Sequence, residues 1–252
     1  MAIIAVLNQK GGVGKTTSVI NLASYLGKSG NRVTVVDFDP QGNATSGLGI
    51  DKEGLSSTIY DIVINKDSLI DALVETRFEN ISILPTNQQL AGAEVELAAT
   101  ENREFKLQEA LKDHETDFVL IDCPPSLGLL TINALVAADY VLIPVQSEYY
   151  ALEGLSQLIT VIQRVRESLN QELKILGVVL TMADSRTSLA DQVEAEVRKH
   201  FTDLVFKTVI PRNVRLAEAP SHGRPISEHD KWSKGAKAYK NLSKEMLNRV
   251  SS

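Results

Sequence analysis

The sequence predicts an α/β fold in which helices cover both faces of a twisted, mostly parallel β-sheet. Two observations carry this prediction. Short runs rich in Ile and Val recur along the whole chain, and segments with helical spacing of apolar residues lie between them. Strands that alternate with helices form βαβ units with right-handed crossovers. The chain has 252 residues, 43% hydrophobic and 23% charged, and we expect residues 1–252 to form a single domain.

Seven runs have the length of a strand. They show little alternation between apolar and polar residues, which is typical of strands buried on both faces. The runs are residues 3–7, 33–36, 81–84, 118–121, 140–145, 175–180 and 205–210. In open sheets of this kind, ligands bind beyond the carboxyl ends of the strands. Functional residues are therefore expected where these runs end.

Helices are predicted where apolar residues recur at intervals of three and four, because that spacing puts them on one face. Such stripes are Val19, Leu22, Ala23 and Leu26; Leu155, Leu158, Ile159, Ile162 and Val165; and Leu189, Val193 and Val197. A last helix is expected near residues 235–250, with an apolar stripe beside several lysines. We expect this stripe to pack on the core. The alternative is a membrane-binding helix, but those carry larger and bulkier apolar faces.

A glycine-rich loop follows the first predicted strand and leads into a helix. Gly14-Lys15-Thr16 fits the end of the phosphate-loop pattern, although Gln9 stands where that pattern has its first glycine. Glycines let successive N–H groups point at phosphate oxygens, and the helix N-terminus adds partial positive charge. Lys15 could neutralise the β- and γ-phosphates, and the Thr16 hydroxyl could ligate Mg²⁺. The alternative is a glycine turn with an incidental lysine. The candidate nucleotide-binding residues here are Lys10, Gly11, Gly12, Val13, Gly14, Lys15, Thr16 and Thr17.

Acidic residues end two of the predicted strands. Asp37 and Asp39 follow residues 33–36, and Asp122 follows residues 118–121. A hydrophobic strand that delivers an aspartate beside a phosphate loop is the Walker B arrangement, in which the carboxylate helps to hold Mg²⁺ and its waters. Asp122 is therefore a candidate metal residue. The alternative for all of these acids is the capping of turns and helices.

The spelling Lys-Gly-Gly-Val-Gly-Lys-Thr-Thr resembles the deviant phosphate loop of the family that includes ParA/Soj partitioning ATPases, MinD and the nitrogenase iron protein. The resemblance implies that Lys10 reaches across a homodimer to the nucleotide of the other subunit. The alternative is a lysine that serves only its own subunit. The resemblance also implies that Asp39 orients the attacking water. Asp37 is then expected in the outer shell of Mg²⁺.

The resemblance to ParA/Soj extends over nearly the whole chain. The matching segments are residues 39–49, 122–134, 144–154 and 210–223. The chain begins directly with a predicted strand and shows no N-terminal helix-turn-helix domain, which resembles the short chromosomal type. The nitrogenase iron protein is set aside because its cluster needs two cysteines per subunit, and Cys123 is the only cysteine here.

The loop after the last predicted strand is the candidate base-binding segment. The resemblance places adenine recognition at Pro211, Arg212 and Asn213, with Met182 and Asp184 near the base. Backbone and side-chain amides in this loop could bind the base edge. The alternative is ordinary loop structure.

The charge distribution points to an anionic partner despite a net charge of −6. Residues 198–252 hold twelve Lys or Arg and five Asp or Glu, a net charge of +7 that leaves −13 for the rest. The alternative is a solvated C-terminal helix. The resemblance implies that a dimer binds DNA without sequence preference, through positions that match Arg186 and Arg215. Weaker candidates are Lys199, Lys207 and Lys234, and ordinary surface ion pairs are the alternative.

Together these features predict a cytoplasmic, nucleoid-associated ATPase of the ParA/Soj type that segregates a chromosome or plasmid. Its expected cofactors are ATP and Mg²⁺. Its expected partners are a second copy of the chain, double-stranded DNA and a ParB/Spo0J-type protein that stimulates slow hydrolysis, with no stable membrane association. One alternative is a MinD-like positioning ATPase at the membrane. Another is a metabolic ATPase such as a cobyrinate amidase relative, although the chain lacks a cysteine pair and an extra substrate domain.

Overall fold

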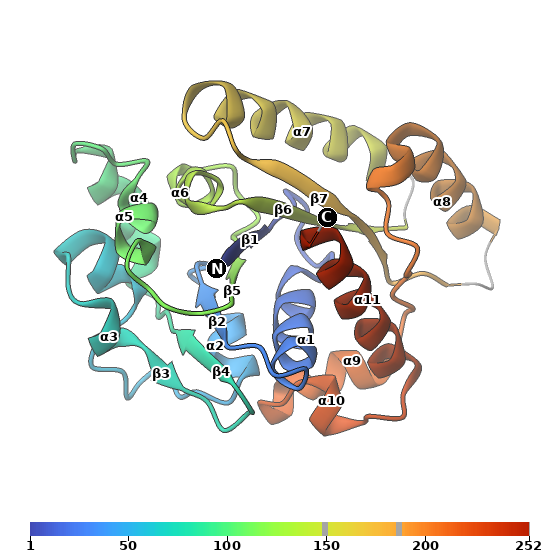
Figure 1. Ribbon diagram of the computed structural model, residues 1–252, viewed down its shortest axis with the longest axis horizontal. Helices are drawn as coiled ribbons and strands as arrows, with labels where there is room; N and C mark the ends of the chain where they lie inside the picture. Colours follow the sequence, from blue (N-terminus) through green and yellow to red (C-terminus); the bar gives the residue numbers. More distant parts are fainter. Residues whose placement is uncertain (148–150, 185–187, 252) are drawn as a thin grey trace.

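One seven-stranded sheet organises the chain in the computed structural model, which describes residues 1–147, 151–184 and 188–251. Of residues 151–153 and 188–191 it describes the backbone alone. The strand order is β3-β4-β2-β5-β1-β6-β7, and only the β3–β4 pair is antiparallel (Figure 1). The strands are β1 (Ala2–Val6), β2 (Val33–Asp37), β3 (Val74–Glu75), β4 (Ile81–Leu84), β5 (Phe118–Asp122), β6 (Tyr140–Gln146) and β7 (Lys174–Thr181). The predicted α/β fold with a mostly parallel sheet is confirmed.

Helices connect the strands and cover both faces of the sheet (Figure 1). They are α1 (Lys15–Gly27), α2 (Asn43–Gly47), α3 (Leu69–Ala72), α4 (Leu90–Ala98), α5 (Lys106–Leu111), α6 (Leu129–Ala137), α7 (Ala151–Ser168), α8 (Ser188–Phe201), α9 (Val214–Glu218), α10 (Ile226–His229) and α11 (Lys234–Val250). Short turns of 3-10 helix (Thr202–Leu204 and Ala219–His222) and of π-helix (Asp61–Asn65) complete the described elements.

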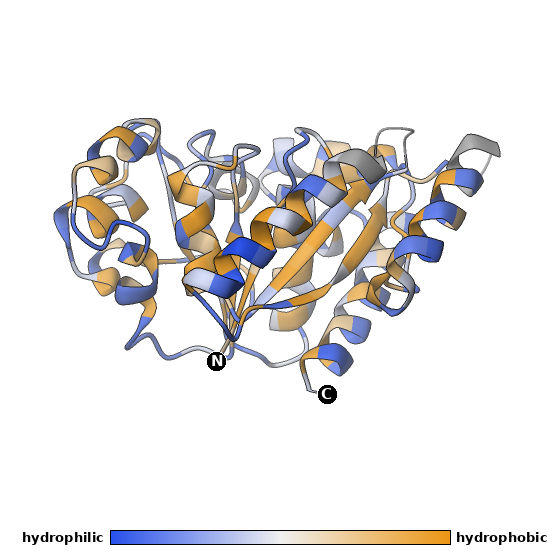
Figure 2. Cartoon of the chain, turned by 90° about the horizontal axis from the view of Figure 1, so that it is seen from above, coloured by the Kyte–Doolittle hydropathy of each residue, from blue (hydrophilic) through white to orange (hydrophobic). Residues whose placement is uncertain are grey.

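Two hydrophobic clusters form the core, one on each face of the sheet. Alternate residues of β1 divide between them: Ile3 and Ala5 pack with the side of α4–α8, and Ile4 and Val6 pack with the side of α1 and α11. Figure 2 shows the hydrophobic strands between helices whose outer sides are hydrophilic. Burial on both faces explains why these strands show no alternation in the sequence.

The C-terminal helix α11 packs on the core, as its apolar stripe predicts. Ala236, Tyr239, Leu242 and Met246 are at most 1% exposed. The Tyr239 hydroxyl lies 3.1 Å from Ser18 Oγ of α1 and shares a hydrogen bond with it. The stripe is therefore covered by the protein itself. None of the helices in the described part of the chain combines the length and apolar character needed to cross a bilayer.

The prediction of a strand at residues 205–210 is wrong. This segment runs beside β7 but forms no continuous ladder with it. Isolated bridges pair Val178 with Val205 and, past the end of β7, Ala183 with Pro211. The seventh strand of the sheet is instead the two-residue β3, which the sequence analysis did not find.

A carboxylate explains why residues 205–210 form no continuous ladder. Glu245 on α11 accepts hydrogen bonds from the backbone N–H groups of Lys207 (2.7 Å) and Thr208 (3.0 Å). Phe206 and Ile210 on either side still donate to carbonyls of β7, at 2.9 and 2.8 Å. The donors in the middle of the segment are thus turned to α11 instead of the sheet. This detour brings the base-binding candidates Pro211 and Asn213 past the start of α1.

Candidate nucleotide-binding site

The glycine-rich loop joins β1 to α1 and has an open side. Gly12 and Gly14 have φ angles of 75° and 91°, in the left-handed region that glycine adopts without steric cost. A Cβ atom added to Gly11 or Gly12 would meet nothing within 4 Å. The loop therefore borders free space directly before the N-terminus of α1. Backbone N–H groups and the helix dipole make such a place favourable for phosphate.

The two lysines of the loop lie in different environments. Lys15 is 7% exposed, and its Nζ donates to the carbonyl of Lys10 at 3.5 Å. Burial lowers the pKa of Lys15, while the nearby charges of Asp122 and Asp39 act in the opposite direction. Lys10 is exposed. One lysine is thus positioned inside the subunit, and the other lies at its surface.

The acidic residues Asp37 and Asp122 meet at the carboxyl ends of neighbouring strands. They are register partners in the β2–β5 ladder, and both are completely buried. Thr16 Oγ1 donates to Asp122 Oδ2 at 2.6 Å. Burial raises the pKa of both aspartates, and the nearby negative charges of Asp39 on Asp37 and of Asp37 on Asp122 act in the same direction. Two buried acids this close to each other favour a cation beside them.

Unpartnered oxygens mark where that cation would bind. The Oδ1 atoms of Asp37 and Asp122 are buried and have no hydrogen-bond partner within the described chain. Buried polar atoms normally have one, so these oxygens fit a ligand role. Mg²⁺ prefers oxygen donors and typically takes one or two carboxylates plus phosphate oxygens. The chemistry of Thr16, Asp37 and Asp122 therefore fits a magnesium ion held next to a nucleotide.

Short contacts fix the remaining carboxylate oxygens. Asp37 Oδ2 accepts from the backbone N and the Oγ1 of Thr45 on α2, both at 2.6 Å. Asp39 is 7% exposed, and its Oδ1 accepts from the backbone N of Gln41 at 3.0 Å. The turn after β2 thus holds Asp39 at the same edge of the sheet as the phosphate loop.

A cavity of about 330 Å³ lies between the phosphate loop and the loop after residue 210. Its lining residues are Gly14, Thr17, Thr181, Met182, Ile210, Pro211, Arg212, Asn213, Leu216, Ala217 and Tyr239. The structure thus brings Pro211 and Asn213 to the start of α1. Asn213 Oδ1 also accepts from the backbone N of Leu216 at 3.3 Å and caps α9. Asp184 lies instead at a neighbouring cavity of about 580 Å³.

Sequence reasoning missed several residues of the 330 Å³ cavity, among them Tyr239 and Leu216. Tyr239 belongs to the apolar stripe of α11, and nothing in its local sequence separates a cavity-lining residue from a core residue. Leu216 lies one turn after Asn213, so the predicted base loop could have suggested it.

The candidate DNA-binding residues are spread over the C-terminal part. Arg215 on α9 is exposed, with its Nη1 2.9 Å from Glu218 Oε2. Lys199 on α8 is exposed and 3.5 Å from a carboxylate oxygen of Glu196. Arg186 lies outside the described residues.

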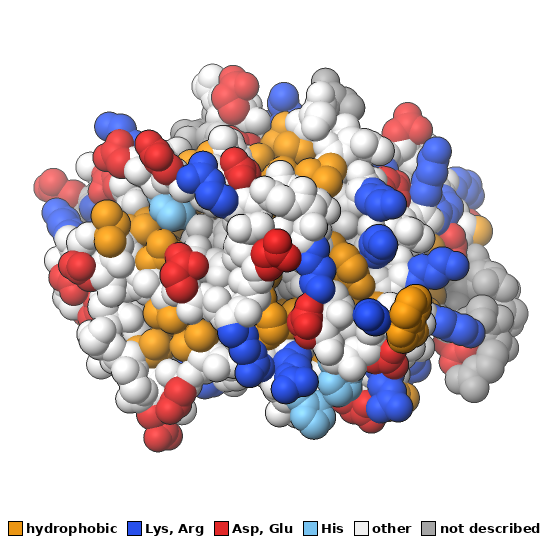
Figure 3. Space-filling view, turned by 60° about the horizontal axis from the view of Figure 1, so that its bottom comes forward, with side chains coloured by type: hydrophobic (Ala, Val, Ile, Leu, Met, Phe, Trp, Pro, Cys, Tyr) orange, Lys and Arg blue, Asp and Glu red, His pale blue; other side chains and the backbone are white. Residues whose placement is uncertain are grey.

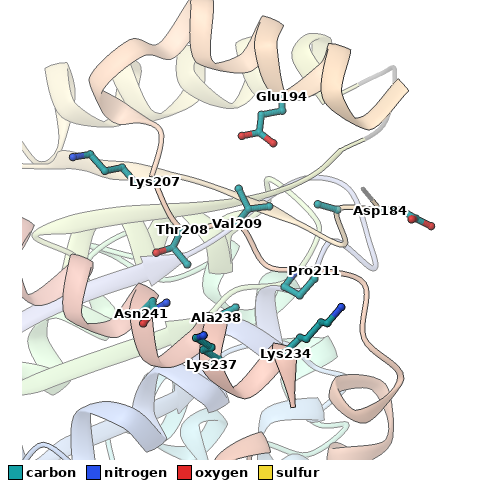
Figure 4. Close-up of a pocket in the computed structure, with 11 residues that line it drawn as sticks. Asp184, Glu194, Lys207, Thr208, Val209, Pro211, Lys234, Lys237, Ala238 and Asn241 are labelled. Carbon is teal, nitrogen blue, oxygen red and sulfur yellow. The ribbon is translucent and has the colours of Figure 1, made fainter. Parts of the chain in front are cut away.

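Lys207 and Lys234 border the 580 Å³ cavity between α8, the end of β7 and α11, together with Lys237 (Figure 4). Lys199 does not line this cavity. The structure therefore groups some of the basic candidates and separates others.

The chain matches known proteins over its whole length. A family model described as an AAA domain matches residues 1–175. The Sporulation initiation inhibitor protein Soj of Bacillus subtilis (strain 168) is 56% identical over 246 residues, 97% of each chain. The chain belongs to the ParA/Soj family. The Chromosome partitioning protein ParA of Myxococcus xanthus (strain DK1622) is 52% identical over 249 residues, 98% of this chain and 88% of that protein. The family predicted from the phosphate loop is confirmed.

A solved structure agrees with the fold and with the chemistry of the site. Cobyrinic acid a,c-diamide synthase from Mycobacterium smegmatis, with a bound ATP analogue and magnesium, superimposes with a TM-score of 0.87 at 38% identity. The match covers 100% of this chain and 96% of the other. A related protein of the same fold thus holds the nucleotide and metal that the acidic and glycine-rich residues of this ParA/Soj family member fit.

Proposed function

We propose that this protein is a partitioning ATPase for a chromosome or plasmid, switched by ATP between single and paired copies. The paired form binds double-stranded DNA without sequence preference. A ParB/Spo0J-type partner then stimulates the reaction of ATP with water to give ADP and phosphate, and this hydrolysis releases the DNA. The observation that carries this proposal is the pair of buried, unpartnered carboxylate oxygens beside the phosphate loop. Support from relatives comes from the 56% identity to Soj.

Each residue of the site has a role in this proposal. The open loop of residues 10–17 and the Lys15 ammonium bind the phosphates. Thr16 and Asp122 would hold Mg²⁺, which would neutralise charge on the phosphate oxygens, and Asp37 would serve its outer shell. Asp39 accepts a hydrogen bond from the attacking water and orients it towards the γ-phosphate. Pro211 and Asn213 line the base cavity.

The contrast between the two lysines supports a sandwich dimer. Lys15 is buried in its own subunit, whereas Lys10 lies exposed at the surface of the subunit. ATP can drive pairing only if it binds the pair more tightly than the single copy. A lysine contact that exists only in the pair supplies such a difference.

Pairing also explains the dependence of DNA binding on ATP. Two copies present twice as many basic side chains, and each neutralised phosphate releases counterions. Arg215 is the main candidate among the described residues, and Arg186 lies outside them. Weaker candidates are Lys199, Lys207 and Lys234. We propose that the protein works in the cytoplasm on the nucleoid. The covered stripe of α11 favours this over a MinD-like role at a membrane.

DNA retention by the purified protein tests the proposal. We expect binding of a 60-base-pair duplex with ATP and Mg²⁺, little binding with ADP or without nucleotide, and steep weakening as salt rises. The variant Lys15→Ala, which should not bind ATP, serves as the control and should behave like the nucleotide-free protein. Equal DNA binding with and without ATP would contradict the proposed switch.

A further inference from the structure

Trp232 has the most exposed large hydrophobic side chain in the described chain, at 86%. It is also the only tryptophan in the sequence. It lies in the short loop between α10 and α11, where packing of the core does not require an aromatic ring. Single exposed hydrophobic residues are common, so the surroundings of the indole decide whether it has a function.

The backbone around Trp232 is held by short hydrogen bonds on both sides. Its N–H donates to Asp230 Oδ1 at 3.1 Å, and Ser233 Oγ donates to the carbonyl of Asp230 at 2.9 Å. Ser233 Oγ also accepts from the backbone N of Ala236 at 3.1 Å and so caps α11. The indole is therefore presented on a fixed support. A contact made from a fixed support loses little conformational entropy on binding.

The same carboxylate links this loop to a candidate DNA-binding residue. Asp230 Oδ2 lies 3.7 Å from Nε of Arg215, while its Oδ1 accepts from Trp232. The ammonium of Lys231 lies 5.3 Å from the centroid of the indole ring. One aspartate thus joins an arginine to the loop of the exposed aromatic ring, and a lysine lies beside that ring. Figure 3 shows lysine and arginine side chains gathered on the right of this face, towards which α9–α11 lie.

We propose that Trp232 packs against the sugar edge of double-stranded DNA while Arg215 and Lys231 contact phosphates on either side of it. This inference rests on the proposed function and adds a contact that carries no charge. Contacts with the sugars and phosphates carry no sequence information, so such a contact fits a protein that binds DNA without sequence preference. Basic neighbours contribute the positive surface charge that attracts a polyanion.

The surface fits DNA better than a lipid bilayer or a protein groove. Membrane-binding segments present a broad apolar face, but here the stripe of α11 is buried and the exposed indole lies beside the Lys231 ammonium. The core of a protein interface is apolar and depleted of charge. Val214, next to Arg215 on α9, is also a large hydrophobic side chain that is exposed, at 71%. An aromatic ring beside Lys231 and a valine beside Arg215, whose guanidinium also pairs with Glu218 and Asp230, make up too small an apolar area for a protein interface and fit a nucleic-acid backbone.

Because Trp232 is the only tryptophan, its fluorescence reports this contact directly. The wild-type protein is loaded with a slowly hydrolysed ATP analogue and Mg²⁺ and titrated with a 24-base-pair duplex. We expect a change in tryptophan emission and at least twofold protection from acrylamide quenching on binding. In parallel, Trp232→Ala should weaken DNA binding about tenfold through the loss of buried apolar area, without changing the slope of log K against log salt. The neighbouring Lys231→Ala should reduce that slope by about one, and Trp232→Phe should bind close to the wild type.

The outcomes separate the inference from the proposed function. If the wild type binds DNA but emission, quenching and the affinity of Trp232→Ala stay unchanged, the inference is wrong and the proposed function stands. If the wild type binds no DNA with the nucleotide present, both fall. Vesicles of phosphatidylglycerol and phosphatidylcholine serve as the third titrant. A blue shift with these vesicles, and none with DNA, would assign the indole to a membrane and overturn the inference.

Discussion

Glu245 holds the segment that leads to the 330 Å³ cavity proposed for the base, so its removal should affect both stability and nucleotide binding. The carboxylate accepts from the N–H groups of Lys207 and Thr208 at 2.7 and 3.0 Å. Hydrogen bonds to a charged group contribute roughly 1.5–3 kcal/mol each. Because the Glu245 side chain is 19% exposed, water replaces part of this in the variant. We therefore expect Glu245→Ala to lower the free energy of unfolding by about 2–4 kcal/mol.

Urea and thermal unfolding measure the effect. For a chain of this size, about 2–4 kcal/mol corresponds to a fall of about 4–16 °C in Tm. Affinity for an ATP analogue should also fall, since residues 205–210 lead directly to Pro211 and Asn213. Glu245→Gln keeps an acceptor but loses the charge, so its effect should be intermediate. The exposed Glu167→Ala on α7 is the matched control and should change stability by less than about 0.5 kcal/mol. If Glu245→Ala behaves like that control, the explanation given for the missing strand is wrong.

Three further predictions test the site and the fold. Lys15→Ala should abolish binding of a fluorescent ATP analogue measured by anisotropy, and unchanged affinity would argue against its proposed contact with phosphate. Leu242→Ala, at a fully buried position of α11, should lower the free energy of unfolding by about 2–5 kcal/mol in urea; a loss below about 1 kcal/mol would mean that the helix is not docked as described. Burial, reinforced by the charge of Arg32, lowers the pKa of His114 below its ordinary value of 6.5, and its Nε2 lies 2.7 Å from Thr34 Oγ1. The unfolded chain then takes up a proton at higher pH than the folded chain, so this part of the stability is complete above about pH 6.5 and is lost as the pH falls. The buried acids Asp37 and Asp122, whose pKa is raised, act in the opposite direction in both proteins, so the comparison is with His114→Gln. From about pH 7.5 to 5 the wild type should lose stability relative to His114→Gln, and parallel pH profiles of the two proteins would contradict the prediction.

Sequence patterns predict an element well when the elements packed against it are also predictable from simple patterns. Residues 3–7 and 118–121 read as strands because both of their faces are buried, and β1 and β5 lie side by side in the sheet. The stripe of Val19, Leu22 and Leu26 predicts α1 because one helix face alone meets the core. The phosphate loop is recognisable because glycines are required at left-handed positions such as Gly12 and Gly14.

The features that sequence reasoning missed depend on partners far away in the chain. Residues 205–210 have the composition of a strand, but Glu245, 38 residues after Lys207, takes the hydrogen bonds that a ladder would need. The strand β3 has two residues and leaves no pattern. Tyr239 lines the base cavity because α11 crosses α1, and its own neighbours in sequence look like any other core stripe.

The most direct test of the central claim, that ATP joins two copies of this chain, is the mass of the particle in solution. Light scattering on the Asp39→Ala variant, with ATP and Mg²⁺, isolates pairing from hydrolysis because the proposed water-orienting carboxylate is absent. We predict twice the mass of one chain with ATP and the mass of a single chain with ADP or with Lys15→Ala. The mass of a single chain under saturating ATP, with binding of the nucleotide verified in the same sample, would contradict the account.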